Sequence, residues 1–200
     1  MTDPRIERWL DLLLATPGLT SIRDRNEARH VHVAQSLIAA EAVEASGSPV
    51  VDVGSGGGSP GIPLAAACPD VTFFLLESNR RKCDFLQEIA GDFPNVEVVC
   101  ERAEEHAAGV GRDRYGTAVS RALAPPPVAA EWCLPLVATG GTAVLFVGPS
   151  ADSGAVARVA EKLGAEGPQG ADGLLVLRKV RPTPEGFPRR PGIAKKRPLA

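Results

Sequence analysis

Apolar and polar positions follow two periods along the chain, which predicts strands and helices in alternation. Short apolar runs bounded by Gly, Pro or Asn are typical of buried strands, whereas apolar residues three or four positions apart are typical of helices. The predicted strands are 50–53, 71–76, 96–100, 115–120, 142–147 and 174–180, and the helices between them are 62–68, 78–91, 128–137 and 153–163. This order predicts an α/β fold with a mainly parallel sheet flanked by helices.

Two further helices are predicted before the first strand. Residues 3–15 have Asp3 as an N-cap and Pro4 in the first turn, with apolar residues on one face, and residues 25–45 carry a second apolar stripe. We expect a helical extension at 1–47, a main domain at 48–182 and a basic tail at 183–200. His30 and His32 are two positions apart and so lie on different helix faces; they are interpreted as ordinary surface or loop histidines, and no metal site is expected.

The rest of the chain is organised around residues 50–63. An apolar strand with an acid, Asp52, runs into five glycines between positions 54 and 61. Glycines allow a sharp turn and a close approach to a ligand, and Pro60 or Pro63 fits the first turn of a following helix. In a parallel α/β sheet such a loop lies at the carboxyl edge of the strands, where ligands bind. The sequence therefore predicts a ligand loop.

Two classes of ligand fit this loop. The spacing Gly56-x-Gly58-x-x-Gly61, with Glu77 further along, matches a dinucleotide site, which leaves a nicotinamide-dependent reductase as an alternative. The spacing Asp52-x-Gly54-x-Gly56-x-Gly58 is typical of S-adenosylmethionine enzymes. Asp52 favours the second class, because a carboxylate can face a cationic methionine group but would repel a pyrophosphate. A reductase would also need a proton donor such as Tyr-x-x-x-Lys, and Tyr115 is followed by Val119 instead.

Three later positions are candidate ligand contacts. Glu77 ends the second strand, where a carboxylate can accept hydrogen bonds from both ribose hydroxyls. Ala103 and Glu104 follow the third strand, where they could flank an adenine or simply begin a charged helix. Arg121 follows the fourth strand and could neutralise a carboxylate or phosphate, or form a structural salt bridge.

Residues 124–127 limit the chemistry. They lack the acidic or amide residue with an aromatic neighbour that exocyclic amine methylases use, and they lack a Pro-Cys nucleophile. A target that is already nucleophilic, such as guanine N7, remains. Catalysis would then consist mainly of alignment and electrostatics, with Arg121 as the organising catalytic residue.

Charge is concentrated at the end of the chain. The net charge is −2, yet residues 178–200 hold eight basic side chains and one acid, so the remainder is negative. Prolines at 188, 191 and 198 predict a stiffened, extended arm that forms no ordinary helix and can lie along an RNA backbone. The expected RNA contacts are Arg189, Arg190, Lys195, Lys196 and Arg197; the alternative is a solubilising terminus.

The four cysteines, at 68, 83, 100 and 133, contain no Cys-x-x-Cys pair, so neither a zinc site nor a disulfide is expected. A reducing cytoplasm is the expected compartment. The first twenty residues are too charged for a signal peptide, and no segment is long enough to cross a membrane.

The motifs together resemble one family, the small-subunit ribosomal RNA guanine-N7 methyltransferases, also called glucose-inhibited division protein B. The matching segments are 51–63, 75–86, 95–99 with 102–105, 120–122 and the tail 187–199. The resemblance implies a Rossmann-like class I methyltransferase that uses S-adenosylmethionine, with cofactor contacts from Gly54, Ser59, Ala103, Glu104 and Arg121. It also implies ribosomal RNA, or an assembly intermediate, as the partner of a cytoplasmic monomer.

Three positions depart from that family's pattern. Ser59 stands where the family usually has a large apolar residue, Gln35 where it has an aspartate, and Val147 where a lysine precedes the glycine. The last two positions are expected to shape the substrate site. A catalytically weak RNA-binding member of the same fold is therefore kept as an alternative.

Overall fold

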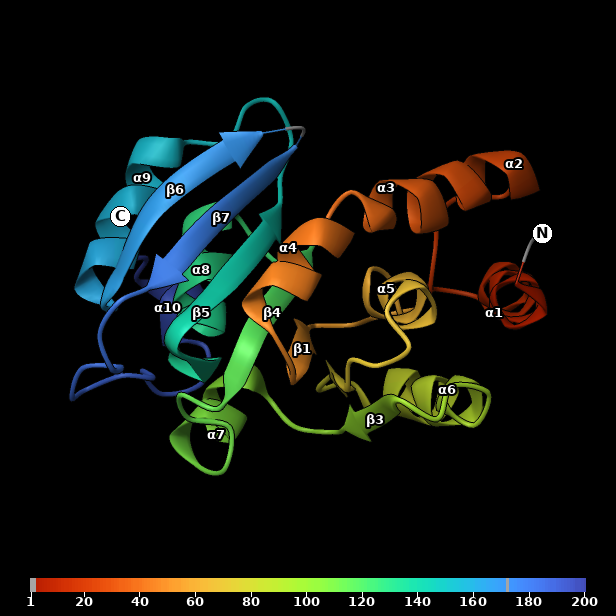
Figure 1. Cartoon of the computed structure of the whole chain (residues 1–200), viewed down its shortest axis with the longest axis horizontal. Coiled ribbons are helices and arrows are strands. Elements are labelled where there is room, and N and C mark those ends of the chain that lie inside the picture. The colour runs from red at the N-terminus through yellow and green to blue at the C-terminus, as the bar shows by residue number, and fades with distance from the viewer. Residues whose placement is uncertain (1–2, 172) are drawn as a thin grey trace.

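The computed structural model describes residues 3–171 and 173–200. Its centre is a seven-stranded sheet in the order β3-β2-β1-β4-β5-β7-β6 (Figure 1). The strands are β1 (Val50–Val53), β2 (Phe73–Leu76), β3 (Val96–Val99), β4 (Tyr115–Arg121), β5 (Val137–Phe146), β6 (Ala165–Ala171) and β7 (Leu174–Lys179). The first five strands are parallel, and β7 and β6 complete the sheet as antiparallel strands. The predicted mainly parallel sheet is confirmed.

Helices cover both faces of the sheet. One hydrophobic cluster joins it to α1 (Pro4–Ala15), α4 (Ala40–Ser46), α5 (Gly61–Ala67) and α6 (Arg80–Ala90). The other joins it to α7 (Ala103–Ala108), α8 (Pro126–Cys133) and α9 (Ser153–Lys162). Along β1, Val50 belongs to the first cluster and Val51 and Val53 to the second, because successive strand residues point to opposite faces.

The sequence missed strand β6 and misplaced one helix boundary. The β6 segment is rich in Gly and Pro, a composition that argues against a strand, but β6 is an edge strand that pairs only with β7, where a proline is tolerated. The helix predicted at 128–137 instead ends at Cys133, continues as the 3-10 turn Leu134–Leu136 and gives way to β5.

The N-terminal extension begins as predicted and then differs. Asp3 caps α1 by accepting from the Arg5 amide, and Trp9 Nε1 donates to the carbonyl oxygen of Gly57 at 2.8 Å. The single helix predicted at 25–45 is wrong. The chain forms α2 (Arg25–Ala28), a π-helical segment (Arg29–Ala34), α3 (Gln35–Leu37) and α4. A π-helical segment inside a helix often marks a functional region, and this one leads to the site.

Two expectations about the later chain are also wrong. The tail contains a short helix, α10 (Ile193–Lys196), and folds back on the domain, where Arg112 donates to the carbonyl oxygens of Thr183 and Phe187. Cys83 and Cys100 form a disulfide, because α6 runs back along β3 and brings their Cα atoms to 5.9 Å. A sequence separation of 17 residues gave no sign of this pairing. Within the described ranges, no helix meets the length and hydropathy that a membrane crossing requires.

Candidate functional site

The glycine loop follows β1 at the carboxyl edge of the parallel strands, as predicted. Gly54 has φ +74°, and a Cβ there would lie 2.3 Å from Leu123 Cδ1. At Gly61, a Cβ would meet Asp52 Oδ2 at 2.7 Å. Both positions therefore need glycine, one for its backbone conformation and for space, the other for space alone.

Asp52 lies behind this loop. Its side chain is buried, and Oδ2 accepts from the Gly61 amide at 3.0 Å while Ser55 Oγ donates to the Asp52 carbonyl oxygen. Burial raises the pKa of Asp52 to about 7, against the opposing effects of the Gly61 hydrogen bond and the Arg121 charge. The Asp52 carboxylate thus holds one amide at the end of the loop, that of Gly61. The contact with a methionine group remains a prediction.

Glu77 also holds the loop. Its Oε2 accepts from the Gly56 amide at 3.0 Å, and its Oε1 accepts from the Asn79 amide at 2.8 Å. The carboxylate therefore connects the glycine loop with the start of α6. Each oxygen keeps a lone pair with which a ribose hydroxyl could bond.

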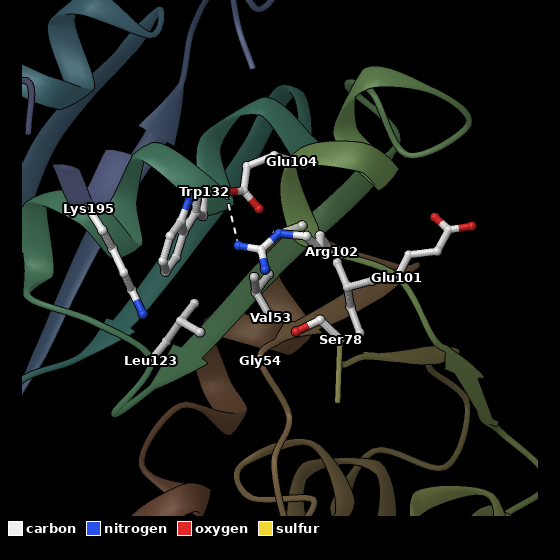
Figure 2. Close-up of a pocket in the computed structure, with 11 residues that line it drawn as sticks. Val53, Gly54, Ser78, Glu101, Arg102, Glu104, Leu123, Trp132 and Lys195 are labelled. Atoms are coloured by element: carbon white, nitrogen blue, oxygen red, sulfur yellow. Dashed lines mark ion pairs between the residues drawn. The ribbon is translucent and has the colours of Figure 1, made fainter. Parts of the chain in front are cut away.

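A first cavity, the Trp132 cavity, has a volume of about 140 Å³ and lies between the end of β1, the segment after β3 and α8 (Figure 2). Its walls include Gly54, Ser78, Arg102, Ala103, Glu104, Leu123, Trp132 and Lys195. Arg102 pairs with Glu104 at 3.6 Å. Ala103 and Glu104 thus line the cavity and also begin α7, while their contact with an adenine remains a prediction.

The tail forms part of this cavity. The Gly192 amide donates to Glu104 Oε1 at 2.9 Å, and Lys195 Nζ lies 5.2 Å from the centroid of the Trp132 ring. Arg189 does not serve as a free cation. Its Nε and Nη2 each donate at 2.6 Å to the two oxygens of Glu131, which is 3% exposed. Arg189 is therefore held in an ion pair, which argues against its predicted contact with RNA. The side chains of Arg190, Lys195, Lys196 and Arg197 are exposed, and their contacts with RNA remain a prediction.

A second cavity, the glycine-loop cavity, has a volume of about 210 Å³. It is lined by the loop from Gly54 to Gly57 and by Ser59, His32, Lys82 and Arg121. Gly54 belongs to both cavities, so the two adjoin at the end of β1. The Trp132 cavity has both apolar and polar walls, and the adjoining glycine-loop cavity is lined by backbone amides and by positively charged side chains.

Arg121 anchors the second compartment. Its Nη1 donates to the Val31 carbonyl oxygen at 2.7 Å and to Ser36 Oγ at 3.3 Å. Its Nη2 donates to Ser59 Oγ and to His32 Nδ1, the latter at 3.2 Å. Burial lowers the pKa of Arg121. Among the described residues no carboxylate pairs with it, so the alternative of a structural salt bridge is not what this structure shows.

His32 is a site residue that sequence reasoning missed. Burial and the neighbouring Arg121 charge lower its pKa to about 4, so the ring is neutral at pH 7. Because Arg121 can only donate, Nδ1 accepts, and the proton on Nε2 is donated to Thr20 Oγ1 at 2.9 Å. The interpretation as an ordinary surface histidine is wrong. Its only sequence signal was the family-like segment that it begins.

A third cavity, the Phe146 cavity, lies beyond Arg121 and has a volume of about 570 Å³. Arg121 and Ala122 line both this cavity and the glycine-loop cavity. Gln35 and the Val147-Gly148 pair, which depart from the family-like pattern, line it together although more than one hundred positions separate them. The two positions thus meet at one cavity, and their role in shaping a substrate site remains a prediction.

Comparisons with known proteins agree with this geometry. The family model described as GidB, rRNA small subunit methyltransferase G, matches residues 5–162. The ribosomal RNA small subunit methyltransferase G of Pelotomaculum thermopropionicum is 38% identical over 91% of this chain and 83% of its own length. The protein of that name from Moorella thermoacetica is 36% identical over 97% and 89%.

Solved structures show the same fold at low sequence identity. A putative O-methyltransferase from Klebsiella pneumoniae has a TM-score of 0.58 at 18% identity, with 90% of this chain and 92% of that chain covered. A T. thermophilus 16S rRNA methyltransferase, solved with AdoMet and guanosine, has a TM-score of 0.51 at 15% identity, with 78% and 41% covered. The predicted class I methyltransferase fold is confirmed, and the chain belongs to the rRNA small subunit methyltransferase G family.

Proposed function

We propose that this protein uses S-adenosylmethionine to methylate N7 of a guanine in small-subunit ribosomal RNA. The observation that carries the proposal is the position of Arg121, an arginine without a carboxylate partner among the described residues, between the glycine-loop cavity and the Phe146 cavity. Membership of the methyltransferase family supports methyl transfer over the reductase alternative.

The residues present fit the donor. In the Trp132 cavity, Leu123 and Trp132 offer apolar surface and Ser78 a hydroxyl, which suits a nucleoside. In the glycine-loop cavity, loop amides, Lys82 and Arg121 suit the carboxylate of an amino acid. Since Gly54 lines both cavities, one extended ligand could occupy them together. Glu77 lines neither cavity, but it is bonded to Gly56 of the loop, and we propose that it accepts from the ribose.

The chemistry suits N7. S-adenosylmethionine supplies a sulfonium methyl group that a ring nitrogen with a free lone pair can attack without losing a proton. The reaction needs no general base, and the two acids at the loop, Asp52 and Glu77, instead accept hydrogen bonds from backbone amides. The residues would act by binding and alignment, with Arg121 fixing the donor through charge and geometry.

We further propose that the partner is ribosomal RNA, or an assembly intermediate of the small subunit, and that the protein acts as a monomer in the cytoplasm. The names of the relatives support the RNA class. Of the exposed cations of the tail, Lys195 lines the Trp132 cavity, and Arg190, Lys196 and Arg197 belong to the same tail segment; all four could contact phosphates.

Mapping the modified nucleoside tests the function. The purified protein, given labelled S-adenosylmethionine and small-subunit RNA from cells that lack the gene, should yield 7-methylguanosine after nuclease digestion. Calorimetry should show donor binding to the wild-type protein. Glu77→Ala should weaken that binding by about 1–3 kcal/mol, because it leaves hydroxyl groups unpaired. A methyl group on an exocyclic amine or a ribose, or tight NADH binding without donor binding, would overturn the proposal.

A further inference from the structure

The Phe146 cavity is a compartment distinct from the proposed donor cleft. It is formed by the carboxyl ends of β4 and β5 together with the N-terminal helices, and its lining residues include none of the glycine loop at 54–61. It nevertheless shares Arg121 and Ala122 with the glycine-loop cavity. A ligand inside it would therefore lie next to the donor and would meet it at the Arg121 and Ala122 boundary.

The boundary between the two cavities has an unusual backbone. Ala122 has φ +54°, a left-handed conformation that residues with a Cβ rarely adopt. Such strained positions cluster at functional sites, where the surrounding structure maintains them. The Ala122 side chain is a single methyl group, so this position adds little bulk where the cavities meet.

The cavity combines apolar surface with a few polar groups. The half-buried ring of Phe146 forms one part of the wall, and Ile38, which is 44% exposed, forms another. Leu37, the preceding residue, is also exposed, at 38%, but it does not line the cavity. Gln35 adds an amide that can both donate and accept. A concave site with mainly apolar walls and a few polar groups is typical of a pocket for a small ligand group.

A nucleobase matches these features. Its flat faces stack on aromatic and aliphatic side chains, and its polar edge can pair with a side-chain amide. Enzymes that modify a base must also take it out of its stack and place it in a pocket. We propose that the Phe146 cavity receives the target guanine, flipped out of the RNA, with Phe146 stacked against its face and Gln35 at its polar edge. This inference rests on the proposed function and names the substrate subsite for it.

The placement is consistent with the reaction. From this cavity the guanine would approach the donor past Arg121 and Ala122. N7 forms a bond to the methyl carbon as the carbon–sulfur bond breaks, so that sulfur keeps the electron pair and the guanine ring takes the positive charge. No proton leaves in this step, and the subsite therefore needs no general base.

Truncating the stacking residue separates base binding from donor binding. Phe146→Ala should lower kcat/KM for RNA by about 10- to 100-fold, because a stacked base is lost. The Kd for S-adenosylmethionine should change much less, because the four hydrogen-bond partners of Arg121 remain, although its guanidinium loses the Phe146 ring at 5.9 Å. The matched control is Val110→Ala, another exposed apolar residue at 74% exposure, in the loop after α7. It should leave both values unchanged.

A second variant reports on stacking directly. Phe146→Trp keeps a flat surface and should retain most of the activity. With S-adenosylhomocysteine bound, its added fluorescence should be quenched when substrate RNA is added. If the wild type forms 7-methylguanosine but Phe146→Ala keeps full kcat/KM and Phe146→Trp is not quenched, the subsite is wrong while the proposed function stands. If the wild type forms no 7-methylguanosine, the proposed function itself fails, and the subsite with it.

Discussion

Two partly buried arginines, Arg121 and Arg189, differ in how their charge is balanced. Arg189 is paired bidentately with the buried carboxylate of Glu131. Arg121 is surrounded by neutral acceptors: a carbonyl oxygen, two hydroxyls and an imidazole. A paired arginine fastens the tail to α8. An arginine held by neutral groups keeps its positive charge at the cleft, where an anionic ligand can form an ion pair with it.

The charge of the partner groups, and not the extent of burial, distinguishes the structural arginine from the functional one. Both guanidinium groups make short hydrogen bonds, and both hold two segments far apart in the chain together. Arg121, moreover, lines both the glycine-loop cavity and the Phe146 cavity. Four changes would test or refine this difference.

The largest effect is expected at Arg121. Arg121→Lys should lower kcat/KM by roughly 100-fold, because an ammonium cannot reproduce the fork that reaches Val31, Ser36, Ser59 and His32 together. Activity and donor affinity should fall together. The matched control is Arg114→Lys, at the opposite end of β4, which should change neither. Equal activity of Arg121→Lys and wild type would place Arg121 among structural arginines.

The next effect is expected at Glu131. Glu131→Gln leaves the Arg189 charge poorly paired and should lower the free energy of unfolding by about 2 kcal/mol, less than a fully buried pair would cost because Arg189 is 20% exposed. Glu88→Gln, in an exposed pair with Arg8, should cost less than about 0.5 kcal/mol. The double variant Arg189→Met/Glu131→Leu should recover much of the loss. Denaturant unfolding measures all three, and a double variant no better than the single one would argue against the ion pair.

A smaller effect is expected in the pH dependence of stability. The pKa of His32 is lowered to about 4 from 6.5, so its neutral form contributes fully above pH 6.5 and that contribution is lost as pH falls toward 4. The pKa of Asp52 is raised from 3.8 to about 7, so stability falls as pH rises across that range. The two slopes oppose each other between pH 4 and 6.5.

His32→Gln should therefore reveal the Asp52 slope. Its free energy of unfolding should decrease with rising pH by at most about 1.4 kcal/mol per pH unit, whereas the wild type stays flatter. His30→Gln, at an exposed position two residues earlier, is the control. Denaturant titrations at several pH values measure these slopes, and parallel curves for His32→Gln and wild type would contradict the assignment.

The smallest effects are expected on the tail. Replacing Arg190, Lys196 and Arg197 with Gln should reduce the salt dependence of RNA binding by about 0.7–0.9 units of slope per lost phosphate contact. The double variant Arg189→Met/Glu131→Leu should leave that slope unchanged, since Arg189 is already paired. Donor affinity should remain nearly constant in both. A slope that drops as much in the second variant would return Arg189 to the RNA surface.

Sequence reasoning succeeded where a local pattern determines a local structure. The alternation of apolar runs located six of the strands, because burial between helices requires such runs. The glycine loop was identified because Gly54 and Gly61 occupy positions that exclude a side chain. Edge strand β6 and the tail helix α10 had no such pattern, since neighbouring elements, and not their own residues, favour them.

Only part of the candidate site could be predicted from local sequence patterns. Gly54, Ala103, Glu104 and Arg121 were identified by their places after strands, and all of them line the cavities. His32 and Lys195 were not assigned to the cleft, because distant segments fold back onto it. His32 lies 89 positions from Arg121, and Lys195 lies more than sixty positions from Trp132. Such contacts depend on how elements pack and leave no spacing in the sequence.

The sequence by itself determined the α/β architecture, the loop at the carboxyl edge and the acids that hold it, because each follows from local periodicity or backbone freedom. Tertiary structure alone decided which charges are compensated. Arg121 and Arg189 look alike along the chain, yet packing places one among neutral acceptors and the other against Glu131. The electrostatic role of a charged side chain depends on the groups around it in space, and distant segments supply those groups.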